Sequence, residues 1–245
     1  MARTLRILDQ DPEARPKVFT SDYVGRFRAG QQIDDLPVSL DAWRVTTGDP
    51  DVAAAVAERF GGSPQEWQTS KEDNLEVLTT ANSVRVIIDN ADAVSFRMAL
   101  YGATGKPIHL CDGVEFVGDD DPRRGQPCGC PATLVERKAA EKAGYGPKPD
   151  IRVVFRLADD AALGKFRMMT GSWSFMKELE TVWADLDSVG GPALCELRLE
   201  LVEFTTKKGV DVSFRKPAIK VVGRAPENTD APLLSLSQAG DEPPF

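Results

Sequence analysis

The sequence predicts a mainly β protein of the α+β class, built as an antiparallel OB-like barrel with flanking helices and a zinc-ribbon-like insertion. Apolar and polar residues alternate over several runs, 151–159 and 194–204 among them, which is the period of half-buried strands. A helical pattern is placed between the third and fourth strands of a small antiparallel barrel, which is the order of an OB-fold. Because the strands do not alternate with helices, a doubly wound α/β sheet fits less well.

The first 70 residues are expected to form an N-terminal arm and one short helix. Arg, Lys, Pro and Gly are mixed with little periodicity over the first thirty, which indicates a loose arm with one short extended piece. Asp49 can cap a helix over 51–60, with Pro50 in its first turn and Gly61-Gly62 past its end.

The barrel is expected over residues 71–224. Period-two runs predict strands over 93–101, 151–159 and 164–171, and two or three more between 194 and 222. The run 74–89 is either two strands or one long strand bent near Ala81-Asn82. Ser172 can begin a helix that ends at Gly190-Gly191. Its apolar residues recur at helical spacing and are expected in the core: Phe175, Leu179, Val182, Trp183 and Leu186.

An insertion over 102–150, with a short helix within 132–146, carries the single histidine and three of the four cysteines. His109 and Cys111 form an H-x-C pair, and Cys128 and Cys130 form a C-x-C pair after a polar loop. Two short pairs of N and S ligands can complete the tetrahedron that structural zinc requires. The alternative is three reduced thiols in a polar loop. Cys195 lies in an alternating run and is expected in the core.

The sequence predicts no enzyme. It contains no Walker A, GxSxG or GxGxxG motif, and the one histidine is assigned to the metal. Asp119-Asp120-Asp121 reads as a solvated acidic turn, because neither a bidentate Glu nor EF-hand spacing follows. A metal-dependent hydrolase centred on that turn is the weaker alternative.

The net charge of −8 argues against a strongly basic duplex-DNA binder, but not against a local basic groove. Cations and aromatics interleave on the predicted strands, as in binders of single-stranded nucleic acid. The competing interpretation places the rings in the core and the cations in solvent, since neighbouring strand residues point to opposite faces. The candidate nucleic-acid-facing residues are Arg97, Arg152, Arg156, Arg167 and Lys216.

The sequence favours a cytoplasmic location, without a membrane partner. No apolar run is long enough for a signal peptide or a membrane helix. The cysteines are therefore expected as reduced thiols or metal ligands rather than as a disulfide framework.

Residues 225–245 are expected to form a disordered acidic tail, rich in Pro and small polar residues and free of Lys and Arg. The chain ends on Asp241, Glu242, Pro243, Pro244 and Phe245. This end resembles the acidic tip of bacterial single-stranded DNA-binding proteins. The resemblance implies recruitment of host replication proteins, with the terminal ring and carboxylate held in a basic pocket. A tail without a partner is the alternative.

Four stretches, YGATGKPIHLCDG, PCGCP, GYGPKPDIRVVFRL and TGSWSF, together resemble the recombination directionality factors of Streptomyces temperate phages that use a large serine integrase. The resemblance runs over most of the chain. It implies a non-enzymatic protein that binds serine integrase on its DNA attachment sites and switches it from integration to excision. The alternative function is a single-stranded DNA-binding or replication accessory protein that uses the acidic tip.

Overall fold

The computed structural model describes residues 22–33, 36–67, 69, 73–205 and 209–226. In that part of the chain, eleven strands form one sheet. The strands are β1 (Gly25–Ile33), β2 (Leu36–Thr47), β3 (Pro64–Glu66), β4 (Leu75–Leu78), β5 (Ser83–Ile88), β6 (Val94–Tyr101), β7 (Pro107–Cys111), β8 (Lys148–Leu157), β9 (Asp160–Thr170), β10 (Ala193–Thr205) and β11 (Asp211–Arg224). The helices are α2 (Pro50–Phe60), η2 (Ala91–Ala93), α3 (Leu134–Lys142), α4 (Trp173–Met176) and α5 (Leu179–Val189).

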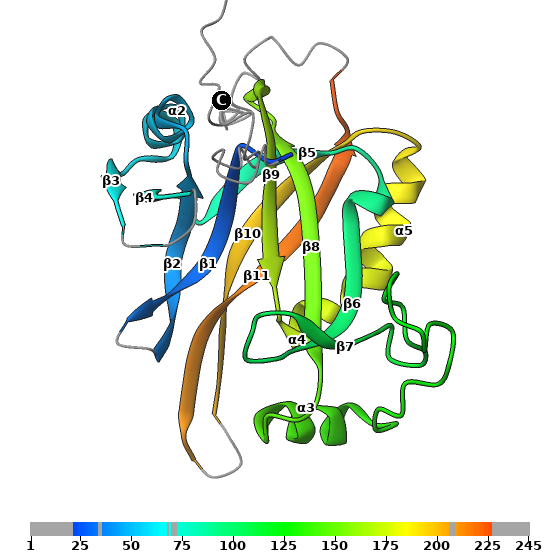
Figure 1. Cartoon of the computed structure of the whole chain (residues 1–245). Helices are drawn as coiled ribbons and strands as arrows, with labels where there is room; N and C mark the ends of the chain where they lie inside the picture. The colour runs from blue at the N-terminus through cyan, green and yellow to red at the C-terminus, as the bar shows by residue number, and fades with distance from the viewer. Residues whose placement is uncertain (1–21, 34–35, 68, 70–72, 206–208, 227–245) are drawn as a thin grey trace, which may run out of the picture.

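The strand order is β11-β10-β5-β8-β9-β1-β2-β4-β3, and β6 pairs with both β8 and β7. Every pairing is antiparallel except that of β1 with β9, which is parallel. Figure 1 shows the consequence: β1 and β2 stand beside β9 and β8, while β7 and α3 lie together at one end of the molecule.

The segment for which the sequence predicts a loose arm contains two long strands, β1 and β2. β1 pairs with β9 over Gly25–Phe27, and β2 continues the sheet to β4. Arg26, Phe27 and Arg28 do alternate, with Phe27 buried in the core. This alternation is short, and the surrounding Gly and Gln residues conceal it, so the sequence does not reveal the strands.

The sequence analysis predicts neither β3 nor β7, and the remaining elements follow the sequence with three refinements. α2 begins after Asp49, whose side chain accepts the backbone N–H groups of Asp51 and Val52 as expected. The run 74–89 forms two strands with different neighbours, since β4 pairs with β2 and β5 pairs with β8. The expected single helix after Ser172 is divided into α4 and α5. β11 runs unbroken through Pro217, which an edge strand tolerates because one side needs no ladder hydrogen bond.

The core lies on one face of the curved sheet and centres on the ring of Phe27. The rings of Trp43, Phe60, Phe155 and Phe166 surround it edge-on, at centroid distances of 5.3 to 6.4 Å. Helices α2, α4 and α5 complete this core by burying Val52, Val56, Phe175, Leu179, Val182 and Leu186. Cys195 is fully buried there as well, as the sequence predicts.

The mainly β class with flanking helices is confirmed. The backbone ladder of the described residues is an open, mixed sheet rather than a continuous ring of hydrogen bonds. Its curvature nevertheless brings β2 to β11, where the Ser39 hydroxyl bonds to both the N–H and the C=O of Arg215. The Arg215 guanidinium also donates to Asp41, at 2.8 Å. Polar contacts therefore bring two distant strands of the sheet together.

Among the described helices, none has the length and apolar character that a membrane crossing requires.

Replacing Phe27 with Ala should lower the free energy of unfolding by about 3–5 kcal/mol, because it removes the ring on which four others pack. The matched control is Tyr145→Ala, since Tyr145 is 71% exposed and its loss should change stability by about 0.5 kcal/mol or less. Urea unfolding followed by tryptophan fluorescence measures both. Equal effects of the two substitutions would contradict the position of Phe27 at the centre of the core.

Candidate metal centre and the arginine face

The structure brings together the four residues that the sequence predicts as metal ligands. The ligand atoms of His109, Cys111, Cys128 and Cys130 all lie within 4.8 Å of one another. Cys111 is fully buried and Cys128 nearly so, while His109 and Cys130 are half-buried. In the described part of the chain, this is the one group of His, Cys, Asp and Glu side chains that could hold a metal ion.

The separations agree with tetrahedral coordination by two kinds of ligand. The Sγ atoms of Cys111 and Cys130 are 3.8 Å apart, and Cys130 Sγ is 3.5 Å from His109 Nε2. A tetrahedron with metal–sulfur and metal–nitrogen bonds of zinc length has edges of about 3.8 Å and about 3.5 Å. Four protein ligands fill such a site, so it leaves no open position for a substrate.

The first ligand pair is placed by β7. His109 and Cys111 are two residues apart on this strand, so their side chains leave the same face. β7 is held by β6, in which Leu100 and Met98 pair with His109 and Cys111. The H-x-C spacing therefore works because the segment is extended.

The second ligand pair is brought to the first by a tight turn after β7. The Asp112 carboxylate accepts the N–H groups of Val114 and Glu115, and Gly113 adopts a φ of 104° that favours glycine. The returning chain is then bonded back, with the Cys128 N–H donating to the Val114 carbonyl at 2.8 Å. Gly129, at a φ of 71°, lets both flanking cysteines turn inward.

The environment of the cluster is apolar, which disfavours thiolates unless a cation binds. Burial raises the pKa of the Cys111 thiol, and burial likewise raises the pKa of Cys130. Burial, together with the charge of Arg123, lowers the pKa of His109 below its ordinary value. A metal ion would therefore bind a neutral imidazole and displace protons from the thiols.

The acidic turn Asp119-Asp120-Asp121 does not join the metal cluster. Asp121 forms a salt bridge with Arg123 at 2.8 Å, and Asp119 forms one with Arg124 at 2.5 Å. Arg123 also lies 4.0 Å from the ring of Phe116, beside His109. The salt bridges of this turn thus help to hold the loop in place around the ligands.

We call residues 112–130, which follow β7 and carry Cys128 and Cys130, the metal loop. Helix α3 connects this loop to the body of the protein, a role that the sequence does not reveal. Arg137 donates to the Gly113 carbonyl at 2.7 Å, and the Trp173 indole donates to Glu141. A capping box formed by Thr133 and Glu136 starts the helix. The T-x-x-E pattern could have identified the helix start, but nothing in the sequence reveals its contact with the loop.

A groove of about 330 Å³ lies between the metal loop and α4–α5. Its lining includes Met98, Val114, Leu134, Met176, Trp173 and Trp183. Val114 is 71% exposed although it is apolar, and Leu134 is also exposed. Because Asp112, Gly113 and Val114 form one wall, the shape of this groove depends on the metal loop.

Four of the five candidate nucleic-acid-facing residues share the face of the sheet opposite the core. Cross-strand pairing places them and their cationic neighbours together on β1, β6, β8 and β9. We call this set the arginine face: Arg26, Arg28, Arg97, Arg152, Arg156, Lys165 and Arg167. The rings of Phe155 and Phe166 point to the core instead, so on these strands the aromatics are structural. Lys216 lies on β11, where it contacts Glu178 and Glu200.

Carboxylates position most of these arginines without neutralising the whole face. Asp150 accepts from Arg97 at 2.8 Å and from Arg152 at 3.0 Å. Burial alone would raise the pKa of Asp150, but the two arginines outweigh it and hold the pKa below its ordinary value. Asp73 contacts Arg26 and Arg28 in the same way.

Arg167 lies at the centre of the arginine face. It forms no salt bridge with any other described residue. Burial lowers its pKa, and the charges of Arg26 and Arg152 lower it further. Its guanidinium lies 4.8 Å from the ring centroid of Tyr23. An anion placed here would relieve repulsion among three cations.

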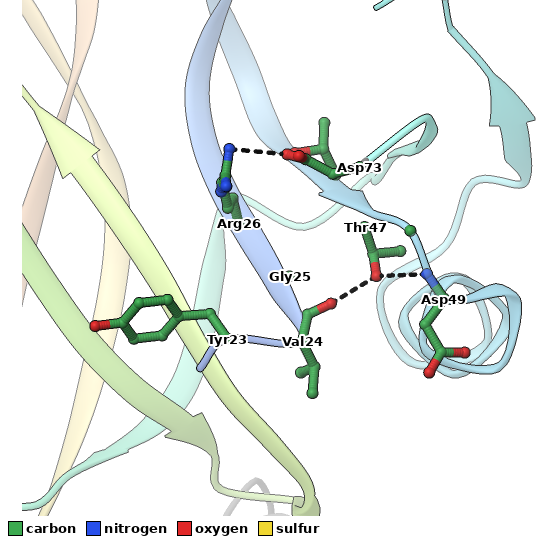
Figure 2. Close-up of a pocket in the computed structure, with 9 residues that line it drawn as sticks. Tyr23, Val24, Gly25, Arg26, Thr47, Asp49 and Asp73 are labelled. Atoms are coloured by element: carbon green, nitrogen blue, oxygen red, sulfur yellow. Dashed lines mark hydrogen bonds and ion pairs between the residues drawn. The ribbon is translucent and has the colours of Figure 1, made fainter. Parts of the chain in front are cut away.

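A smaller cavity of about 210 Å³ adjoins this face between β1 and β2. Figure 2 shows Arg26 directed at Asp73, while Thr47 bridges Val24 and Asp49 on the opposite side. The polar groups of the cavity thus satisfy one another. The predicted partner-binding end, Asp241 to Phe245, lies outside the described residues.

The cluster geometry predicts about one metal ion per chain. Cys130→Ala should lose that ion, because three ligands hold zinc-type metals far more weakly than four, whereas Cys195→Ala should retain it. Elemental analysis of the purified variants measures both, and wild-type protein treated with a chelator should unfold at a lower temperature. An unchanged metal content in Cys130→Ala would refute the assignment.

Comparison with known families places these features in context. No solved structure matches the chain. A family described as Gp3-like, recombination directionality factor-like, matches residues 24–222, which include β1 to β10, all but the last two residues of β11, and both ligand pairs. The match covers most of the chain, and the chain therefore belongs to the Gp3-like family of recombination directionality factor-like proteins.

Proposed function

We propose that this protein is a phage recombination directionality factor that binds a serine integrase on its attachment sites and switches it from integration to excision. The family match over residues 24–222 carries this proposal. The protein acts in the cytoplasm of the bacterial host as a binding partner, without reaction chemistry of its own. To change direction it must bind one arrangement of the integrase more tightly than the other.

The metal in this proposal is structural zinc. His109 and the three cysteines offer the nitrogen and sulfur ligands that zinc prefers, at separations that fit its bond lengths. The ion would tie β7 to the C-x-C turn and so hold the loop that carries Val114. Its contribution is to shape a surface rather than to activate water.

The groove beside the metal loop is the proposed contact for integrase. Trp and Met side chains, which are enriched at the centres of protein interfaces, line it. Val114, which lines the groove, is 71% exposed, and Val135, which is 79% exposed, extends the apolar surface beyond the groove. An apolar side chain from a helix of the partner would bury area there, in the manner of helix-in-groove recognition.

The arginine face supports a second candidate function, binding of single-stranded DNA as a replication accessory protein. Its cations exceed the carboxylates Asp73, Asp89 and Asp150 that contact them. Affinity for an oligonucleotide that falls steeply between low and high salt would favour this candidate. If the protein acts only as a directionality factor, its control of recombination should not depend on its affinity for single-stranded DNA.

Adding the purified protein in molar excess to its cognate integrase and DNA carrying the two hybrid sites should yield excised product. The same addition should suppress joining of the phage and bacterial sites, because one set of contacts shifts both equilibria. Gel electrophoresis of the recombination products measures both reactions. Absence of excision at every ratio tested would refute the proposal.

Val114→Asp should reduce excision by about tenfold or more, since it places a charge in an apolar contact. The change leaves the backbone bond between Val114 and Cys128 available. Val222→Asp is the matched control, because Val222 is 54% exposed and does not line the groove. Both variants should keep the wild-type metal content and circular dichroism. Equal excision by the two would show that integrase binds elsewhere.

A further inference from the structure

We propose that the acidic segment 227–245 docks on the arginine face of its own chain and shields that face from other polyanions. The occupant is this segment, defined by its residues, and the site is the sheet surface formed by Arg152, Arg156, Arg167 and their neighbours. The inference is independent of the integrase proposal, since it concerns how the chain contacts itself.

The first argument is the place where the chain leaves the described structure. β11 ends at Arg224, and Ala225 packs in a small cluster with Ile87, Ala158 and Ala161. Its N–H donates to the Pro192 carbonyl at 2.8 Å. Ile87 pairs across β5 and β8 with Arg156, so the cluster lies on the same side of the sheet as the arginine face. The segment therefore starts beside the surface that it is proposed to cover.

The second argument is charge complementarity. The charged side chains of the segment are Glu227, Asp230, Asp241 and Glu242, and the segment has no Lys or Arg. The arginine face offers the opposite sign, and Arg167 lacks a salt bridge to any other described residue. The Nε atoms of Arg152, Arg156 and Arg167 are also buried without a hydrogen-bond partner in the described structure.

The third argument is reach. Strands in a sheet are about 4.8 Å apart, so β1 lies three spacings, roughly 14 Å, from β5. Residues 227–245 can extend over roughly 60 Å, which is ample to cross β8, β9 and β1. Individual surface ion pairs are weak, but a tethered segment is present at an effective concentration of about millimolar. Several weak contacts can therefore hold it in place.

A crosslinking experiment on the full chain tests the contact directly. A zero-length carbodiimide should join carboxylates of residues 227–245 to Lys165, the exposed lysine of the arginine face. Mass spectrometry of a mixture of isotopically light and heavy chains should show this crosslink within single chains. Replacing Arg152 and Arg167 with Gln should reduce its yield severalfold. Absence of the crosslink, or its occurrence between copies, would overturn the proposal.

A titration tests the shielding. A full-length variant with Glu227→Gln, Asp230→Asn, Asp241→Asn and Glu242→Gln should bind fluorescent oligo(dT) about tenfold more tightly at low salt. The control variant has Glu58→Gln, Asp92→Asn, Asp185→Asn and Asp187→Asn, exposed positions with the same total charge change. It should show little gain. Adding Arg152→Gln and Arg167→Gln to the first variant should abolish the gain.

The titration has clear contrary outcomes. Equal gains for the two neutralised variants would mean that net charge alone governs binding, and no gain in the first would mean that the segment covers nothing. Tight binding of oligo(dT) by the wild-type chain, unchanged by neutralising the segment, would assign the arginine face to nucleic acid instead. Each of these results would overturn the docking proposal while leaving the excision assay unaffected.

Discussion

The parallel pairing of β1 with β9 is the constraint on which the remaining architecture depends. It is the one parallel contact in the described sheet, and it joins the strand pair β1–β2 to β8–β9. Phe27 reaches the rings of Phe155 and Phe166 only because of this pairing. Arg26 is placed beside Arg167 by the same register. One short ladder therefore creates the core on one face and the cationic surface on the other.

The metal cluster and the apolar groove form a second unit with a different basis. Its local order comes from turns and hydrogen bonds around Asp112, Gly113 and Gly129 rather than from a long ladder. Helix α3 connects this unit to the body through Arg137 and Glu141. A bound ion would replace the large hydrophobic core that a loop of this size cannot build. The surface of this unit can therefore change shape with little effect on the core of the sheet.

Much of the fold and the metal cluster could be predicted from the sequence, for identifiable reasons. His109, Cys111, Cys128 and Cys130 stand out because ligand chemistry restricts both residue type and spacing. The capped helix after Asp49 is equally local. The sequence does not reveal β1, because its pairing with β9 spans more than a hundred residues of sequence and no local pattern encodes such a contact. For the same reason Arg26 and Arg28 were absent from the candidate surface, whereas Arg152, Arg156 and Arg167 were found on well-patterned strands.

The meeting of Ser39 with Arg215 has a mechanical consequence. Within the described residues, a hydroxyl and one guanidinium join β2 to β11, which share no backbone ladder. Because side chains rather than a backbone ladder join β2 to β11 there, these two strands can separate without breaking a backbone ladder.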